Sequence, residues 1–233
     1  MSGHSKWASI KRKKGATDAK RGQLFSKLAR AIIVAAREGG PDPAANLALQ
    51  NAIEKAREAS MPKDNIEREI ARGAGPAGDG ASYETITYGG YGPSGIAVYV
   101  EAVTDNRNRT AADVRHIFTK SDGSLGESGS VAWLFERRAV VLVDGSADED
   151  ELILAAAEGG ADDVEREGDS WRVVAAPEAR TSVREAIEAA GMTVESADLT
   201  MVPKTTVEVD DESAVKKVVR LMEALEDNDD IQD

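Results

Sequence analysis

The chain has 233 residues, and its 29 Lys and Arg against 42 Asp and Glu leave a formal net charge of −13. It has no cysteine and only two histidines, His4 and His116, which excludes a disulfide framework, Cys-ligated metal centres and a thiol nucleophile. Neither an apolar run of about 20 residues nor an apolar segment after the basic N-terminal residues is present. We therefore expect a soluble, cytoplasmic protein that does not bind membranes.

The charge is distributed unevenly along the chain. Residues 1–40 carry ten Lys and Arg against two acids, whereas the part after residue 72 has a net charge of −20. Scattered cations would be explained by solvation of helix surfaces. Cations clustered on one end of an acidic chain favour phosphate binding, because the acidic remainder repels phosphate and orients the molecule.

The sequence pattern of the first third of the chain predicts a basic arm followed by three helices. Residues 1–17 show neither a helical nor a strand period. Apolar residues then recur at three- and four-residue steps, and Gly- and Pro-containing segments interrupt them. The expected helices are Asp18–Glu38, Ala44–Ala59 and Pro62–Arg72. Short connections between them favour a helical bundle.

A Gly-rich segment, Gly73–Gly80, follows the predicted bundle. It contains the pattern G-x-G-x-x-G, which binds dinucleotide phosphates only when it lies between a strand and a helix. Here a predicted helix precedes the pattern and a predicted strand follows it. We expect a linker and no dinucleotide site.

Two α/β regions are predicted after the linker. The first has strands at Tyr83–Tyr88, Ile96–Thr104 and Val131–Phe135 and a helix at Asn108–Lys120. Residues 139–202 then follow the order β-α-β-β-α-β of a ferredoxin-like fold. Its expected strands are Ala139–Val143, Asp163–Arg166, Trp171–Ala175 and Thr193–Met201, and its expected helices are Glu149–Glu158 and Pro177–Ala190.

The last segment predicts a strand, Thr205–Val209, and a helix, Ser213–Leu225. These two elements cannot bury their apolar faces alone, so we expect them to return to the sheet of the first α/β region. The predicted fold class is α+β with three domains. These are a basic arm with a three-helix bundle at 1–75, a discontinuous α/β domain at 80–136 plus 204–233, and an inserted ferredoxin-like βαββαβ domain at 137–203.

Six segments carry longer motifs. They are GHSKWASIK from Gly3, FSKL from Phe25, MPKDNI from Met61, YGPSG from Tyr91, TDNRNRT from Thr104 and LGESGSVAW from Leu125. In this order the motifs resemble the YebC/PmpR family, which includes the mitochondrial translational activator of cytochrome oxidase. The resemblance extends from residue 2 to about residue 230.

The resemblance implies a helical bundle with two α/β domains and a non-enzymatic role. That role is transcriptional regulation through DNA or, in part of the family, relief of ribosome stalling on proline-rich nascent chains. Family members usually continue past the last acidic stretch with a short strand. Because this sequence stops at Ile231-Gln232-Asp233, we expect the middle sheet to lack its final strand.

The candidate nucleic-acid-binding residues lie in the arm, in the first helix and in the loop at 104–110. Trp7 can stack on an unpaired base while neighbouring cations neutralise phosphates; packing against the bundle beside Ile10 is the alternative. In the loop, Arg side chains suit phosphate oxygens, and Asn side chains either read base edges or cap the following helix. The predicted set is His4, Lys6, Trp7, Lys11, Arg12, Lys13, Lys14, Lys20, Arg21, Lys27, Arg107 and Arg109.

An enzymatic function is not expected. Ser128 lacks the nucleophile-elbow pattern, because Ser130 stands where that pattern needs Gly. His116 is the candidate base, and it lies within a predicted helix. We expect neither a cofactor nor a metal.

The leading hypothesis is a monomeric regulator of gene expression that binds ribosomal RNA and relieves stalling. The alternative is a DNA-binding transcriptional regulator, which needs an element that fits a groove and usually two-fold symmetry; helix-turn-helix spacing and a dimerisation stripe are not evident. A third hypothesis is a protein-interaction module in which the acidic part binds a basic partner.

Overall fold

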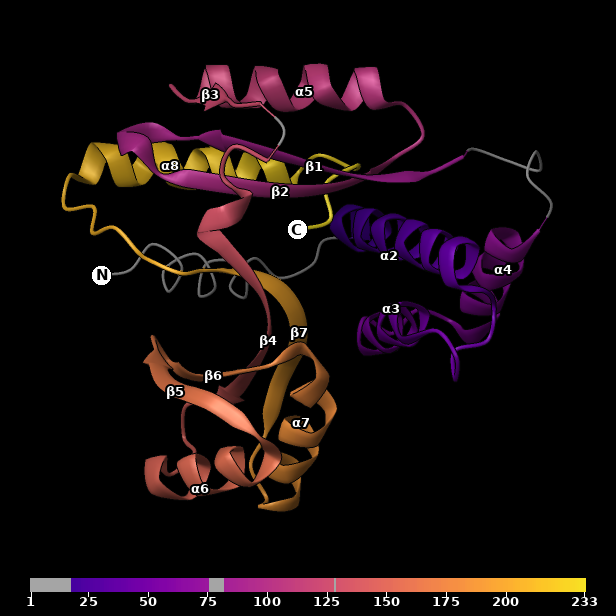
Figure 1. Ribbon diagram of the computed structural model, residues 1–233, viewed down its shortest axis with the longest axis vertical. Coiled ribbons are helices and arrows are strands. Elements are labelled where there is room, and N and C mark those ends of the chain that lie inside the picture. The colour runs from indigo at the N-terminus through magenta and orange to yellow at the C-terminus, as the bar shows by residue number, and fades with distance from the viewer. Residues whose placement is uncertain (1–17, 76–81, 128) are drawn as a thin grey trace. The chain divides into compact units, whose positions relative to one another are not determined.

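The computed structural model describes residues 18–75, 82–127 and 129–233 (Figure 1). These residues belong to two compact units. One is the described part of Gly15–Ser130 together with Lys216–Asp233, and the other is Val131–Val215. Each unit contains helices and an antiparallel sheet, so the predicted α+β class is confirmed. The division into three domains at the stated boundaries stays a prediction.

The first unit begins with the three predicted helices. They are α2 (Asp18–Gly39), α3 (Leu47–Glu58) and α4 (Lys63–Ala74), and α2 packs against both of the others. Apolar residues at helical spacing fill the space between them, among them Ile32 and Leu49, which are fully buried.

A three-stranded antiparallel sheet completes the first unit. Its strands β1 (Glu84–Tyr91), β2 (Ala97–Thr104) and β3 (Ser124–Leu125) lie in the order β2-β1-β3. Helices α5 (Arg107–Lys120) and α8 (Glu212–Glu226) accompany this sheet (Figure 1). Side chains at alternate positions of β2 join Phe118 of α5 and Leu221 of α8 in one buried cluster. The expected return of the last helix to this sheet is confirmed.

The chain end also pairs with this sheet, through a bridge and not through a full strand. Ile231 forms an antiparallel bridge with Ala102 of β2. The Val103 amide donates to the Asp230 carbonyl at 2.7 Å, and the Gln232 amide donates to the Glu101 carbonyl at 2.7 Å. The sheet thus has three strands, and the chain end adds an isolated bridge at its β2 edge where a further strand was not expected.

Two predicted strands are wrong. Residues 205–209 form no strand, and Val207 is 66% exposed; β-branched residues favour a strand only where a neighbouring strand and a buried face are available. Within Val131–Phe135, residues Ala132–Leu134 form a 3₁₀ turn in which the Leu134 amide donates to the Val131 carbonyl at 2.9 Å. The following strand begins at Phe135.

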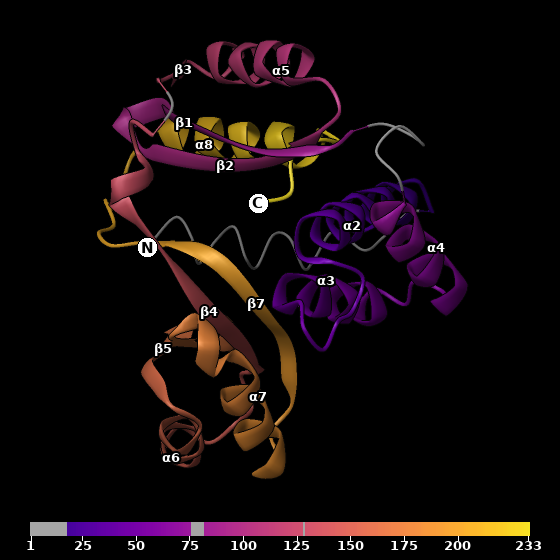
Figure 2. The same cartoon turned by 45° about the vertical axis from the view of Figure 1, so that its right-hand side comes forward.

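The second unit has the predicted β-α-β-β-α-β order. Its four strands are β4 (Phe135–Asp144), β5 (Ala161–Glu167), β6 (Ser170–Ala175) and β7 (Val194–Pro203). They lie in the order β5-β6-β4-β7, with every neighbouring pair antiparallel; Figure 1 labels all four, and Figure 2 shows the unit from a second side. Two helices pack on the face of the sheet that carries Ala139, Val141 and Val143 of β4. Leu152 and Ile187 of these helices belong to the same buried cluster. The two helices are α6 (Glu149–Gly159) and α7 (Arg180–Ala189).

The described ranges lack both a membrane-spanning helix and a metal-binding cluster. Within residues 18–75, 82–127 and 129–233, no helix is long and apolar enough to cross a membrane. The same residues contain no group of three or more His, Cys, Asp or Glu side chains placed to hold a metal ion.

Candidate nucleic-acid interface

The predicted arm residues lie outside the described part of the chain, and their role stays a prediction. They are His4, Lys6, Trp7, Lys11, Arg12, Lys13 and Lys14. The other five predicted residues lie on α2 and in the first turn of α5, and the structure separates them into exposed and internally bonded cations.

Two cations of α2 face solvent. Lys20 and Arg21 are exposed in the helix that directly follows the arm. The Arg21 guanidinium lies over the ring of Phe25, 5.4 Å from its centroid. This contact orients the side chain and leaves its charge accessible to an anion.

Lys27 has a partner within the protein. Its Nζ donates to the carbonyl oxygen of Glu226 at 2.7 Å, at the end of α8. The last carbonyls of a helix have no partner within the helix, and a cation placed there also interacts favourably with the helix dipole. Gln23, four residues earlier, donates in the same way to the Asp227 carbonyl at 2.8 Å. This contact accounts for Lys27 without a nucleic-acid ligand.

The Asp230 carboxylate lies at the centre of a polar cluster between α2, the 104–110 loop and the chain end. Its residue is 5% exposed. Oδ1 accepts from Arg30 Nη1 at 2.9 Å, and Oδ2 accepts from Thr110 Oγ1 at 2.7 Å, Arg109 Nη2 at 3.0 Å and Thr104 Oγ1 at 3.2 Å. Burial raises the pKa of Asp230, but hydrogen bonds from Thr110 and Arg109 and the charges of Arg109 and Arg30 outweigh burial and lower its pKa below the ordinary value.

The two arginines of the TDNRNRT motif have different surroundings. Arg109 Nη2 also donates to Asp105 Oδ1 at 2.8 Å, and the hydrogen bonds to Asp230 and Asp105 raise the pKa of its guanidinium. Arg107 is exposed at the first position of α5, and no ion pair joins it to another described residue. Asn106 caps α5 by accepting from the Arg109 amide at 3.1 Å, so the predicted capping role is confirmed.

Sequence reasoning missed the cluster around Asp230. Arg30, Thr104, Thr110 and Asp230 carry it, and none was a candidate. Thr104 and Thr110 are the end residues of the TDNRNRT motif, and that was the available signal. Their acidic partner is more than a hundred residues away along the chain, at a separation of 120 from Thr110, so no local pattern identifies it.

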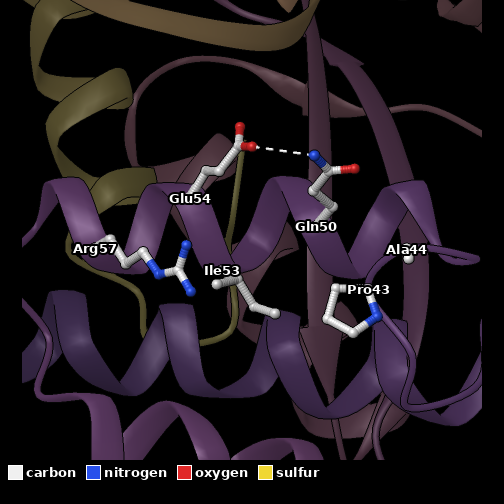
Figure 3. A pocket seen from close by; sticks show the side chains of 6 residues that line it. All are labelled: Pro43, Ala44, Gln50, Ile53, Glu54 and Arg57. Carbon is white, nitrogen blue, oxygen red and sulfur yellow. Dashed lines mark hydrogen bonds between the residues drawn. The ribbon is translucent and has the colours of Figure 1, made fainter.

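A surface hollow of about 250 Å³ lies along α3 (Figure 3). Gln50 donates to Glu54 at 3.4 Å across its rim, and the Arg57 side chain lies beside Ile53. The lining residues include one carboxylate and one guanidinium but no Ser, His or Lys. They do not form an acid–base pair or a nucleophile with its base.

Comparison with known proteins identifies the family. Residues 5–76 match the family model described as the TACO1/YebC protein N-terminal domain, and residues 83–233 match the one described as the TACO1/YebC second and third domain. The chain belongs to the TACO1/YebC family. The resemblance that the six motifs indicated is therefore confirmed.

Relatives in this family match along the whole chain. A protein of Rubrobacter xylanophilus is 58% identical over 234 residues, covering 100% of this chain and 93% of the relative. One of Dictyoglomus thermophilum is 53% identical over 234 residues with the same coverage, and both are named probable transcriptional regulatory protein. The crystal structure of a conserved hypothetical protein from Aquifex aeolicus has a TM-score of 0.85 and 47% identity, covering 95% of this chain and 91% of that one.

Proposed function

We propose that this TACO1/YebC family member is a non-enzymatic regulator of gene expression that binds ribosomal RNA through its basic N-terminal region. The family and the names of its relatives support a regulator of gene expression. The observation that carries a nucleic-acid ligand is the separation of charge. Residues 1–40 have ten Lys and Arg against two acids, whereas Val131–Val215 has seven Lys and Arg against 21 acids.

Phosphate contacts supply most of the affinity in this proposal. Each cation that neutralises a phosphate releases condensed counterions, which makes binding strong at low salt and weak at high salt. Lys20 and Arg21 are exposed on α2 and extend the arm's positive charge, and Arg107 adds an exposed guanidinium at the start of α5. Lys27 and Arg109 are bonded within the protein and serve its structure.

The protein would act on the ribosome by positioning ribosomal RNA and the ribosomal components next to it, without making or breaking a covalent bond. Relief of stalling on proline-rich nascent chains is the activity that we propose for it. A monomeric state and a cytoplasmic location stay predictions.

A DNA-binding transcriptional regulator is the second candidate, which the names of the relatives favour. The bundle would then need a helix with free cations for the major groove. On α4, however, acids on the same helix pair with the cations: Lys63 with Glu67 at 3.4 Å, and both Arg68 and Arg72 with Glu69, at 3.0 and 3.7 Å. This pairing reduces the positive charge that α4 offers to a DNA groove. It therefore favours RNA binding by the arm over DNA binding by the bundle.

The test is co-sedimentation of the full chain with 70S ribosomes across a salt series, with duplex DNA as competitor. In the test variant Lys11, Arg12, Lys13 and Lys14 are all replaced by Ala. We expect at least about a tenfold loss of ribosome affinity, because four phosphate contacts are removed. Binding by the wild-type chain should fall with salt and resist duplex DNA.

The control variant loses the same charge from exposed positions elsewhere. It replaces Lys63, Arg115, Lys120 and Arg220 by Ala. Retention of ribosome binding by this control, together with its loss in the arm variant, supports the proposal. Equal binding by the arm variant and the wild-type chain contradicts it, and competition by duplex DNA favours the transcriptional alternative.

A further inference from the structure

Helix α6 carries apolar residues on both of its faces. On the inner face, Leu152, Ala155 and Ala156 belong to the buried cluster of the second unit. On the opposite face, Leu154 is 68% exposed and Ile153 is 43% exposed. The helix lies at the periphery of this unit in both views (Figures 1 and 2). A surface helix normally has one apolar and one polar face, so packing within the unit does not explain the second apolar face.

Helical spacing joins the exposed apolar residues of α6 into one strip. Ala157 is exposed, and it follows Leu154 by three residues and Ile153 by four. Residues three and four apart are neighbours on a helix surface. Apolar side chains that are exposed singly are ordinary, whereas a contiguous patch with a polar border is typical of an interaction site. Ile153, Leu154 and Ala157 are called the apolar strip below.

Acidic side chains border the apolar strip. Each lies three or four residues from Leu154 or Ile153, and the set is Glu149, Asp150, Glu151 and Glu158. All four are exposed, and α6 contains no Lys or Arg. Within the described residues, no ion pair joins any of the four to a cation. The border of the strip therefore carries four negative charges that the unit itself does not neutralise.

Helix stability explains three of these acids and leaves the fourth unexplained. Glu149, Asp150 and Glu151 stand in the first turn of α6, where negative charge interacts favourably with the helix dipole. Glu158 stands next to the last residue of the helix, where negative charge is unfavourable and a cation would be favourable. The carboxylate of Glu158 completes the acidic border at the cost of some helix stability.

We propose that the apolar strip binds a basic amphipathic segment of another protein. The partner's apolar side chains would cover Leu154 and Ile153, and its Lys or Arg side chains would pair with the bordering acids. This inference goes beyond the proposed function, because it requires neither RNA nor the basic arm.

Charge complementarity selects this occupant among those that could cover an apolar patch. Nucleic acid and the anionic surface of a membrane are repelled by four carboxylates, whereas a cationic segment is attracted. The same face of a second copy would place like charges opposite each other, which is unfavourable. An amphipathic helix whose apolar face is flanked by cations satisfies both the strip and its border.

The experiment titrates the full chain into a fluorescein-labelled helical peptide of Leu and Lys, about 18 residues long, with its leucines on one face. Fluorescence anisotropy measures the affinity. One control peptide has the same composition with the leucines distributed around the helix, and another has Glu in place of Lys. The first peptide should bind saturably, and both controls should bind at least about tenfold more weakly, because each lacks one of the two complementary features.

Two variants test the strip and its border separately. Leu154→Ala should weaken peptide binding about tenfold, because apolar contact area is lost. Glu158→Lys should also weaken it about tenfold, since an attractive charge becomes repulsive. The same Glu158→Lys change should leave the thermal unfolding midpoint unchanged or raise it, because Lys suits the end of a helix. A merely structural role for Glu158 would not combine weaker binding with retained stability.

Matched controls make the same changes at exposed positions of the first unit. Leu47→Ala removes a leucine that is 61% exposed on α3, and Asp113→Lys reverses an exposed charge on α5. Both controls should bind the peptide as the wild-type chain does. Equal losses in Leu47→Ala and Leu154→Ala, or in Asp113→Lys and Glu158→Lys, would show general attraction to an acidic protein and overturn the proposal.

Three other outcomes also overturn it. These are absence of peptide binding by the wild-type chain, unchanged binding by Leu154→Ala, and preference for the chain's own arm. The last is measured with a synthetic peptide of residues 1–17: tighter binding than the Leu–Lys peptide, lost in Leu154→Ala, would make the arm the occupant in place of another protein. Ribosome binding by the wild-type chain is measured separately, so failure here leaves the proposed function intact.

Discussion

At the scale of single residues, Asp230 shows how a buried carboxylate joins distant parts of the first unit. Arg30 comes from α2, Arg109 and Thr110 come from the start of α5, and the carboxylate comes from the chain end. A buried charge of this kind is tolerated because its oxygens have several donors. Removing the charge leaves two guanidinium groups without their shared partner.

We expect Asp230→Asn to lower the free energy of unfolding at pH 7 by about 2 kcal/mol. The folded-state pKa of Asp230 is lowered, because the bonds from Thr110 and Arg109 outweigh its burial. The contribution of the carboxylate is therefore complete above its ordinary pKa of 3.8 and is lost as pH falls through the lower folded value.

Urea unfolding at pH 7 and at pH 3 measures this difference. The gap between the wild-type chain and Asp230→Asn should shrink at the lower pH. Asp229→Asn is the matched control, since Asp229 is exposed and contacts Arg30 through its backbone carbonyl at 2.6 Å. A gap that is equal at both pH values would contradict the assignment.

At the scale of elements, the joint between α2 and α3 depends on one amide side chain. Asn46 Nδ2 donates to the carbonyls of Ala35 at 2.7 Å and Gly40 at 2.8 Å. Its Oδ1 accepts from the Leu49 amide at 3.1 Å and caps α3. Asn46 is 6% exposed, so a substitution would leave these backbone groups with little access to water.

Asn46→Ala should therefore lower the free energy of unfolding by about 2–3 kcal/mol, the cost of a lost cap and of unsatisfied buried carbonyls. Chemical denaturation followed by circular dichroism measures it. Gln50→Ala removes an exposed amide with a single 3.4 Å bond to Glu54, and should change stability by less than about 0.5 kcal/mol. Equal losses in the two variants would show that the Asn46 contacts do not stabilise the joint.

At the scale of the whole molecule, the proposed function implies that the acidic unit limits where the basic region would bind. Its 21 acids against seven Lys and Arg repel phosphate, and this repulsion extends over about 10 Å at 0.1 M salt. Under the proposed function, this repulsion would weaken binding to arbitrary nucleic acid more than binding to a target that presents RNA to the arm. The charge on this unit should therefore affect selectivity more than fold.

Neutralising four exposed acids should raise the affinity of the chain for non-specific duplex DNA by roughly threefold at low salt, with the gain disappearing at about 0.5 M salt. The changes are Glu149→Gln, Asp150→Asn, Glu158→Gln and Glu185→Gln. Electrophoretic titration measures the gain. A control that exchanges Asp and Glu at the same four positions keeps the charge and should bind as the wild-type chain does; an unchanged affinity in the neutralised variant would show that repulsion is unimportant.

The sequence alone predicted the helices, most of the strands and the family. Helical periods and Gly and Pro breaks predicted α2–α4, and the alternation of helices and strands predicted the β-α-β-β-α-β order, because these signals depend on neighbouring residues. The clustering of cations before residue 40 is likewise a property of the sequence. The candidate role of the arm follows from that clustering and stays a prediction.

The tertiary structure decided which candidate cations are internally bonded and which face solvent. Lys27 and Arg109 look like Lys20 and Arg107 in the sequence, but their partners lie 199 and 121 residues away. The expected strand at 205–209 lacks a neighbouring strand, whereas residues 230–233 find one at the edge of β2. Burial, ion pairing and strand formation depend on contacts between distant segments, and no local pattern contains that information.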